Sequence, residues 1–265
     1  MKRFFLIIVC CIIWTLTDAQ VLHTGTNNLD ELFQNDITTM SEFRARFNAA
    51  IEISSNLSEN ERLKRILSLF NRNSEAILEK QDLVLSFSNQ ILKSGVPLEY
   101  GDSSWYADVL CAVKYKGAQF DIHLILKTEE VEKSIYRWAF IGANGLRETN
   151  IIHDAAFGFI EPIDDELNFI DLDNRLQKDY TNAFGYKSFE ASVNQLSILL
   201  YLIQEKELTI ESMDKIRYHF LSIPGYVFIV EQSGTPMNSG WLISELSTIT
   251  NEGKKLYEKV LFGNY

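Results

Sequence analysis

The chain has 265 residues, of which 46% are apolar, and its formal net charge is −11 at pH 7. A chain of this length can bury a sizeable hydrophobic core without help from disulfides or metals. An acidic surface repels phosphate backbones and lacks the basic stripe of nucleic-acid-binding proteins, so no nucleic-acid partner is expected.

The amino-terminal segment has the three parts of a secretory signal peptide. Lys2 and Arg3 precede an apolar run over residues 4–16, and Thr-Asp-Ala follows at 17–19. The run is shorter than the roughly 20 residues that a membrane-spanning helix needs. We therefore expect cleavage after Ala19, export to the periplasm or the extracellular space, and no transmembrane segment in the mature chain.

One cysteine remains after cleavage, because Cys10 and Cys11 lie in the leader. Cys111 cannot form an intramolecular disulfide, although the compartment is oxidising. It alternates with polar positions in step with Val109 and Val113, which predicts a buried thiol in a strand rather than a reactive one.

The first third of the mature chain has helical periodicity. The spacing of Phe43 and Phe47 predicts a helix over 41–50. A capping box at Ser58 begins a second helix, and a third is expected over 75–93.

Between residues 105 and 142 the apolar period changes from 3.6 to 2. Alternating residues around Cys111, a turn at 116–117, and the alternating Trp138 and Phe140 predict a three-stranded antiparallel meander with one apolar face and one mixed face.

Shorter strands, helices and a final hairpin are expected after the meander. They are strands at 156–160 and 168–172, helices at 188–205 and 209–221, a hairpin joining 226–231 to 241–246, and a helix at 254–261. The prediction is an α+β fold: N-terminal helices, a curved antiparallel sheet of the meander plus later strands, added C-terminal helices and a final hairpin. Residues 1–19 would be the signal peptide and residues 20–265 a single α+β domain.

Helices followed by long antiparallel strands, over about residues 41–172, resemble the nuclear-transport-factor-2-like (cystatin-like) superfamily. The stretches NDITTMSEFRARFN and WYADVLCAVKYKG look like those of a group of exported, uncharacterised Bacteroidota proteins. This resemblance implies a curved sheet that wraps a helix. It implies no single activity, because that fold hosts enzymes, binding proteins and assembly factors.

Catalytic signatures such as GxSxG, HExxH, CxxC and phosphate-binding glycine loops are absent from the sequence. Closing the first hairpin at 116–117 pairs Leu110 with His123 and places Asp108 two positions along the same mixed face. Arg137 joins this face if the second hairpin keeps the faces in step. The three residues are weak candidates for a general base or an anion clamp. A solvated outer face with scattered polar residues is the simpler interpretation.

No cofactor or metal is expected. The acidic stretch over residues 161–173 has oxygen ligands suited to calcium, but it lacks the glycine of a calcium-binding loop and is better explained as a solvated loop.

Three functional hypotheses remain open on the sequence alone. The first is an exported, non-catalytic binding or accessory module with a small-molecule or protein partner. The second is a small-molecule hydrolase or isomerase that uses Asp108 and His123. The third is a structural or assembly protein of the envelope.

Overall fold

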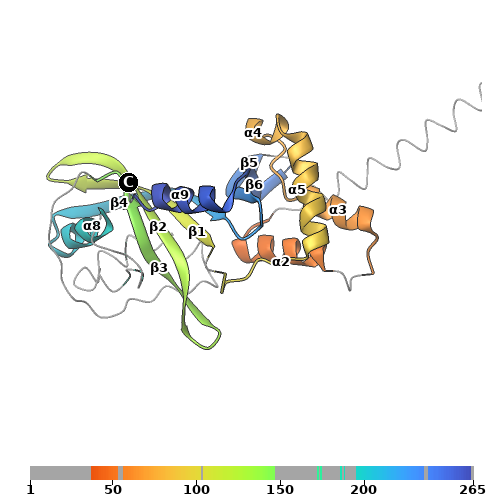
Figure 1. The fold of residues 1–265 in the computed structure, drawn as a ribbon. Coiled ribbons are helices and arrows are strands. Elements are labelled where there is room, and N and C mark those ends of the chain that lie inside the picture. The colour runs from red at the N-terminus through yellow and green to blue at the C-terminus, as the bar shows by residue number, and fades with distance from the viewer. Residues whose placement is uncertain are drawn as a thin grey trace, which may run out of the picture.

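The computed structural model describes residues 37–52, 56–102, 104–146, 195–235 and 238–263, together with positions 172, 174, 186 and 188. In these residues the fold is α+β, with six helices and one curved, unclosed antiparallel sheet of six strands in the order β3-β2-β1-β4-β5-β6. The N-terminal helices gather around β5 and β6 at one end of the sheet, and α8 lies at the other (Figure 1). The predicted signal peptide lies outside the described residues.

Helices form in the three N-terminal regions where the sequence predicts them. They are α2 (Met40–Ile51), α3 (Glu59–Leu67), α4 (Glu75–Leu78) and α5 (Gln81–Ser94). Phe43 and Phe47 are fully buried, and Ser58 forms the expected capping box with Glu61. Gly95 ends α5 in the left-handed conformation that glycine adopts without strain. The third predicted helix is divided in two, since α4 ends at Leu78 and α5 begins at Gln81.

The predicted meander is confirmed as β1 (Trp105–Tyr115), β2 (Ala118–Glu132) and β3 (Ile135–Asn144). Lys116 and Gly117 both have positive φ, as a tight two-residue hairpin turn requires. Leu110 lies opposite His123, as the hairpin register predicts. The second connection is also short, because β2 ends at Glu132 and β3 begins at Ile135.

The predicted helix over 209–221 is wrong, because Leu208–Phe220 is strand β4, paired antiparallel with β1. Two register shifts against β1 each leave an extra residue in β4. The core-facing residues Ile210, Met213 and Ile216 are therefore three apart, although they lie on one face of a strand. A bulged strand with this spacing imitates the apolar period of a helix.

The other C-terminal predictions are largely confirmed. They correspond to α8 (Gln195–Gln204), the hairpin of β5 (Tyr226–Thr235) and β6 (Asn238–Thr248), and α9 (Asn251–Leu261). The strand predicted at 156–160 and the acidic stretch at 161–171 lie outside the described residues. The strand predicted at 168–172 also lies outside them except for Leu172, which is buried and helical.

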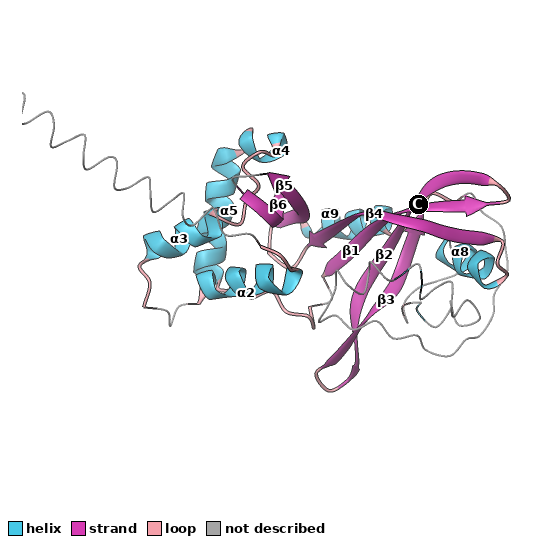
Figure 2. Ribbon diagram, turned by 180° about the vertical axis from the view of Figure 1, so that it is seen from behind, coloured by secondary structure: helices cyan, strands magenta, loops and turns pink. Residues whose placement is uncertain are grey.

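The sheet has a different cover on each face, and Figure 2 shows the strands from behind. On the inner face, Trp105, Trp138 and Cys111 join a continuous apolar core with the N-terminal helices and α8. On the outer face, α9 packs on a smaller apolar cluster that includes Tyr106 and Ile125. Among the helices of the described ranges, none combines the length and apolarity needed to cross a membrane.

Candidate functional site

Asp108 and His123 meet on the outer face because of the β1–β2 register. His123 pairs with Leu110 across the two strands, so Asp108 is its diagonal neighbour. The distance from His123 Nδ1 to Asp108 Oδ1 is 2.7 Å, which is a hydrogen bond. Asp108 is buried, while 42% of the His123 side chain is exposed. The pair therefore joins a buried carboxylate to an imidazole that solvent reaches.

Strand β4 brings two further residues to Asp108. Arg217 lies directly opposite it in the β1–β4 register, and His219 is its diagonal neighbour on that side. His219 Nε2 is 3.7 Å from Asp108 Oδ2, too far for a hydrogen bond, and this buried nitrogen has no hydrogen-bond partner in the described part of the chain. His219 Nδ1 lies 2.6 Å from the hydroxyl oxygen of Tyr257, which comes from α9. A helix and three strands thus meet at one buried carboxylate.

A row of ion pairs continues this cluster toward the far edge of the sheet. Arg217 Nε is 2.6 Å from Glu231 Oε1 on β5, and its guanidinium also binds Glu245 on β6. Lys215 Nζ lies 2.8 Å from the other oxygen of Glu231. Because Arg217 is already held by two carboxylates, it is poorly placed to bind an external anion.

The charges of the cluster change its titration. Burial raises the pKa of Asp108, but the hydrogen bond from His123 and the neighbouring His219 outweigh burial and lower that pKa to about 2. The hydrogen bond to Asp108 raises the pKa of His123. Burial raises the pKa of Tyr257 to about 12. Asp108 is therefore ionised at neutral pH, and Tyr257 keeps its proton.

Arg137 does not join Asp108 and His123, which corrects the prediction that the three converge. It lies opposite Glu129, and its guanidinium is 3.1 Å from that carboxylate. Glu129 is six residues from His123 along β2, which corresponds to about 20 Å at the rise of a strand. Arg137 is 2% exposed and therefore belongs to a separate buried ion pair.

The cluster also contains His219, Arg217 and Tyr257, which were not predicted from the sequence. Because residues 209–221 were wrongly predicted to be helical, His219 and Arg217 were not expected in the sheet. Tyr257 lies on a helix whose place over the sheet no local pattern reveals. Alternation of Tyr218 and Phe220 with His219 was the one signal that could have placed this histidine on the outer face of a strand.

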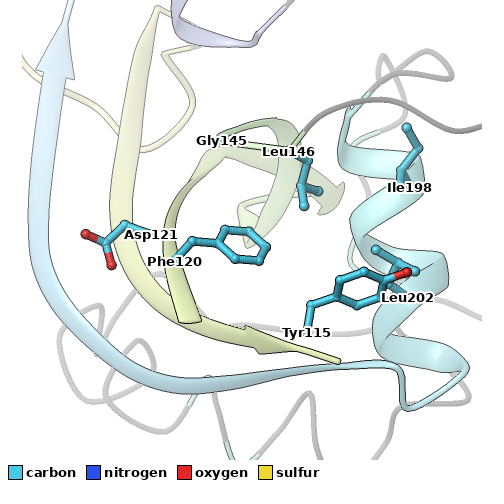
Figure 3. A pocket seen from close by; sticks show the side chains of 7 residues that line it. All are labelled: Tyr115, Phe120, Asp121, Gly145, Leu146, Ile198 and Leu202. Carbon is cyan, nitrogen blue, oxygen red and sulfur yellow. The ribbon is translucent and has the colours of Figure 1, made fainter. Parts of the chain in front are cut away.

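A cavity of about 460 Å³ lies elsewhere, between the β1–β2 turn, the end of β3 and α8. Its lining residues are Tyr115, Phe120, Asp121, Gly145, Leu146, Ile198 and Leu202. Figure 3 shows the Tyr115 and Phe120 rings pointing toward the side chains from α8, while the Asp121 carboxylate points away. The cavity thus has apolar walls from separate parts of the chain.

The local sequence explains these walls. Tyr115 and Phe120 lie at either side of the hairpin turn and continue the inner, core-facing rows of β1 and β2. Gly145 has φ +102°, and a Cβ there would lie 2.7 Å from the Asp121 carbonyl oxygen. Only glycine therefore lets the chain leave β3 this close to β2 and turn toward α8.

A second cavity, of about 410 Å³, lies among α3, α4 and α5. Leu78 and Leu85 line it and are 51% and 44% exposed. Asp108, His123 and Arg137 line neither of these two cavities.

No family model matches this chain, and neither a curated protein nor a solved structure is significantly similar to it. Within the described ranges, no group of three or more histidine, cysteine and acidic side chains is arranged to hold a metal ion. The site must therefore be judged on its own geometry.

Proposed function

We propose that this protein is an exported, non-catalytic binding module and that its small-molecule ligand occupies the cavity between α8 and the β1–β2 turn. The observation that supports this proposal is the cavity itself. Its volume falls within the range of small-molecule sites, and its walls are mostly apolar and aromatic, as is typical of such sites. Its floor continues the packed core, so much of the site exists before a ligand arrives.

The test is to fill the cavity. Leu202→Trp should abolish binding of N-phenyl-1-naphthylamine, an uncharged fluorescent probe, while the variant keeps its melting temperature within a few degrees. Leu85→Trp, in the groove of α3–α5, is the matched control and should bind like the wild type. Equal loss of probe binding in both variants, or equal binding in both, would rule out this cavity as the site.

Export is the second part of the proposal, and it rests on the charged, apolar and small-residue segments of residues 1–19. The resemblance to the nuclear-transport-factor-2-like superfamily likewise remains a proposal. Mass spectrometry of the protein recovered from its native host should find an N-terminus at Gln20. A mature chain that retains residues 1–19, or one that begins at a lipid-bearing Cys10 or Cys11, would contradict export by signal cleavage.

A hydrolase or isomerase is the second candidate, and the Asp108–His123 hydrogen bond favours it. A buried carboxylate that holds one imidazole nitrogen orients the other nitrogen for proton transfer. Nε2 of His123 has no hydrogen-bond partner among the described residues and could fill that role. Hydrolysis of p-nitrophenyl acetate that is equally fast in the wild type and in His123→Ala would remove the hydrolase from this candidate.

A further inference from the structure

The chemistry of the cavity walls indicates which ligands they could accept, if the cavity is the binding site as proposed above. Phe120, Leu146, Ile198 and Leu202 offer no hydrogen bonds from their side chains. Asp121 is the single carboxylic acid among the described lining residues, and its carboxylate points away from the cavity (Figure 3). A charged ligand group buried against these described walls would lose its hydration without gaining a counter-ion from them.

The described lysine beside Tyr115 is already paired. Lys116 Nζ lies 4.8 Å from the centre of the Tyr115 ring and 3.4 Å from Glu207 Oε2. Lys114 Nζ, farther along β1, lies 4.0 Å from Glu211 Oε1. Neither of these two described lysines therefore offers an unbalanced positive charge that would select a carboxylate or a phosphate.

Tyr115 contributes the one polar side-chain group that the described lining residues direct inward. Its ring forms part of the wall, with the hydroxyl toward Leu202 (Figure 3). A phenol can donate one hydrogen bond and accept another at the same time. The Lys116 ammonium lies over the ring of this side chain, and the phenol O–H can donate to an acceptor in the cavity.

We propose that the ligand is an uncharged, mainly apolar molecule with one oxygen acceptor, such as a ketone, ester or ether, which accepts a hydrogen bond from Tyr115. The apolar walls would contribute most of the affinity. Tyr115 would orient the ligand and select against molecules of the same shape that lack the oxygen.

Four naphthalene derivatives that share the same ring system and differ in one substituent test this proposal. 2-Acetylnaphthalene carries a ketone, 2-isopropenylnaphthalene has nearly the same shape without the oxygen, and 2-naphthoate and 2-naphthylmethylammonium carry opposite charges. Titration of the full mature chain is followed by the methyl NMR signals of Leu146, Ile198 and Leu202. The methyl signals of Leu78 and Leu85 in the α3–α5 groove report non-specific apolar binding.

We expect the ketone to bind about two- to tenfold more tightly than the hydrocarbon, as one net hydrogen bond supports. It should bind at least tenfold more tightly than either charged compound. Tyr115→Phe should remove the preference for the ketone over the hydrocarbon while leaving hydrocarbon binding unchanged. Tyr201→Phe, a tyrosine of α8 outside the lining, should preserve the preference.

The outcomes separate the two proposals. If no compound shifts the cavity methyl signals, or if all shift both sets of methyls alike, the binding function itself fails. If a charged compound binds as tightly as the ketone, or if Tyr115→Phe keeps the preference, the cavity binds ligands but the inferred ligand class is wrong.

Discussion

The two faces of the sheet are stabilised in different ways, although the same strands form both. The inner face is apolar. The ring planes of Trp105 and Phe220 stack at 8° to each other, and the ring centroids of Trp138 and Trp105 are 4.8 Å apart. The outer face carries a polar row through Asp108 and Arg217, part of which α9 covers. The inner face is held by close packing, whereas the outer face depends on each buried polar group finding its partner. Substitutions should therefore have different signatures on the two faces.

The largest effect is expected on the inner face. Trp138→Ala should lower the free energy of unfolding by about 3–5 kcal/mol, because a fully buried indole leaves a cavity that the sheet cannot close. Urea denaturation measures this loss. Val131→Ala, at a position that is 48% exposed, is the control and should change stability by less than about 0.5 kcal/mol. A loss below 1 kcal/mol for Trp138→Ala would contradict the burial of this face.

On the outer face, acid should weaken the fold through Asp108. Its pKa is about 2 in the folded chain against 3.8 as the reference value, so its contribution is fully present above pH 4. It is lost as the pH falls through the folded pKa, and it amounts to something on the order of 2 kcal/mol. Urea denaturation at pH 5, 4, 3 and 2 should show a shallower loss in Asp108→Asn than in the wild type. Parallel curves would indicate that the two histidines do not lower the pKa of Asp108.

The contact between α9 and the sheet is expected to give a smaller effect. Tyr257→Phe removes the hydroxyl that meets buried His219 Nδ1, and leaving that nitrogen unpaired should cost about 1–2 kcal/mol. Tyr106→Phe is the comparison, because its hydroxyl bonds Glu258 at 2.8 Å on the same helix. Tyr106→Phe should lower the free energy of unfolding less, since water can replace the Tyr106 hydroxyl at the Glu258 carboxylate. Equal stability of Tyr257→Phe and the wild type would show that the contact between Tyr257 and His219 does not help to hold α9 on the sheet.

The smallest effect concerns the charge of one side chain. The hydrogen bond to Asp108 raises the pKa of His123, so Asp108→Asn should lower the midpoint of the His123 titration, measured by NMR. Asp121→Asn should lower it less, because Asp121 contributes only a weaker charge interaction. Because His123 has a raised pKa when folded, its stabilising contribution is complete below about pH 6.5 and disappears as the pH rises through the folded value. An unchanged midpoint in Asp108→Asn would remove the basis of the enzyme candidate.

Local sequence determined the elements whose partners are near in the chain. Capping at Ser58, the left-handed end at Gly95 and the two-residue turn after Tyr115 each depend on a few neighbouring residues. The β1–β2 register follows from that turn, so the approach of Asp108 to His123 was predictable. Alternation likewise indicated that Trp138 and Cys111 face the core.

Tertiary structure decided what lies beside and above those elements. β4 is a strand because it pairs with β1 about a hundred residues earlier, and its bulges hide the period of 2 that would have revealed it. α9 could have packed on several apolar surfaces, and only the assembled sheet places Tyr257 over His219. Alternation along β3 predicts the face of the sheet on which Arg137 lies. The distance from Arg137 to Asp108 and His123 depends instead on the register between β2 and β3, which pairs Arg137 with Glu129. The cavity walls come from the β1–β2 hairpin, the end of β3 and α8, which are distant from one another in sequence, so no local pattern contains them.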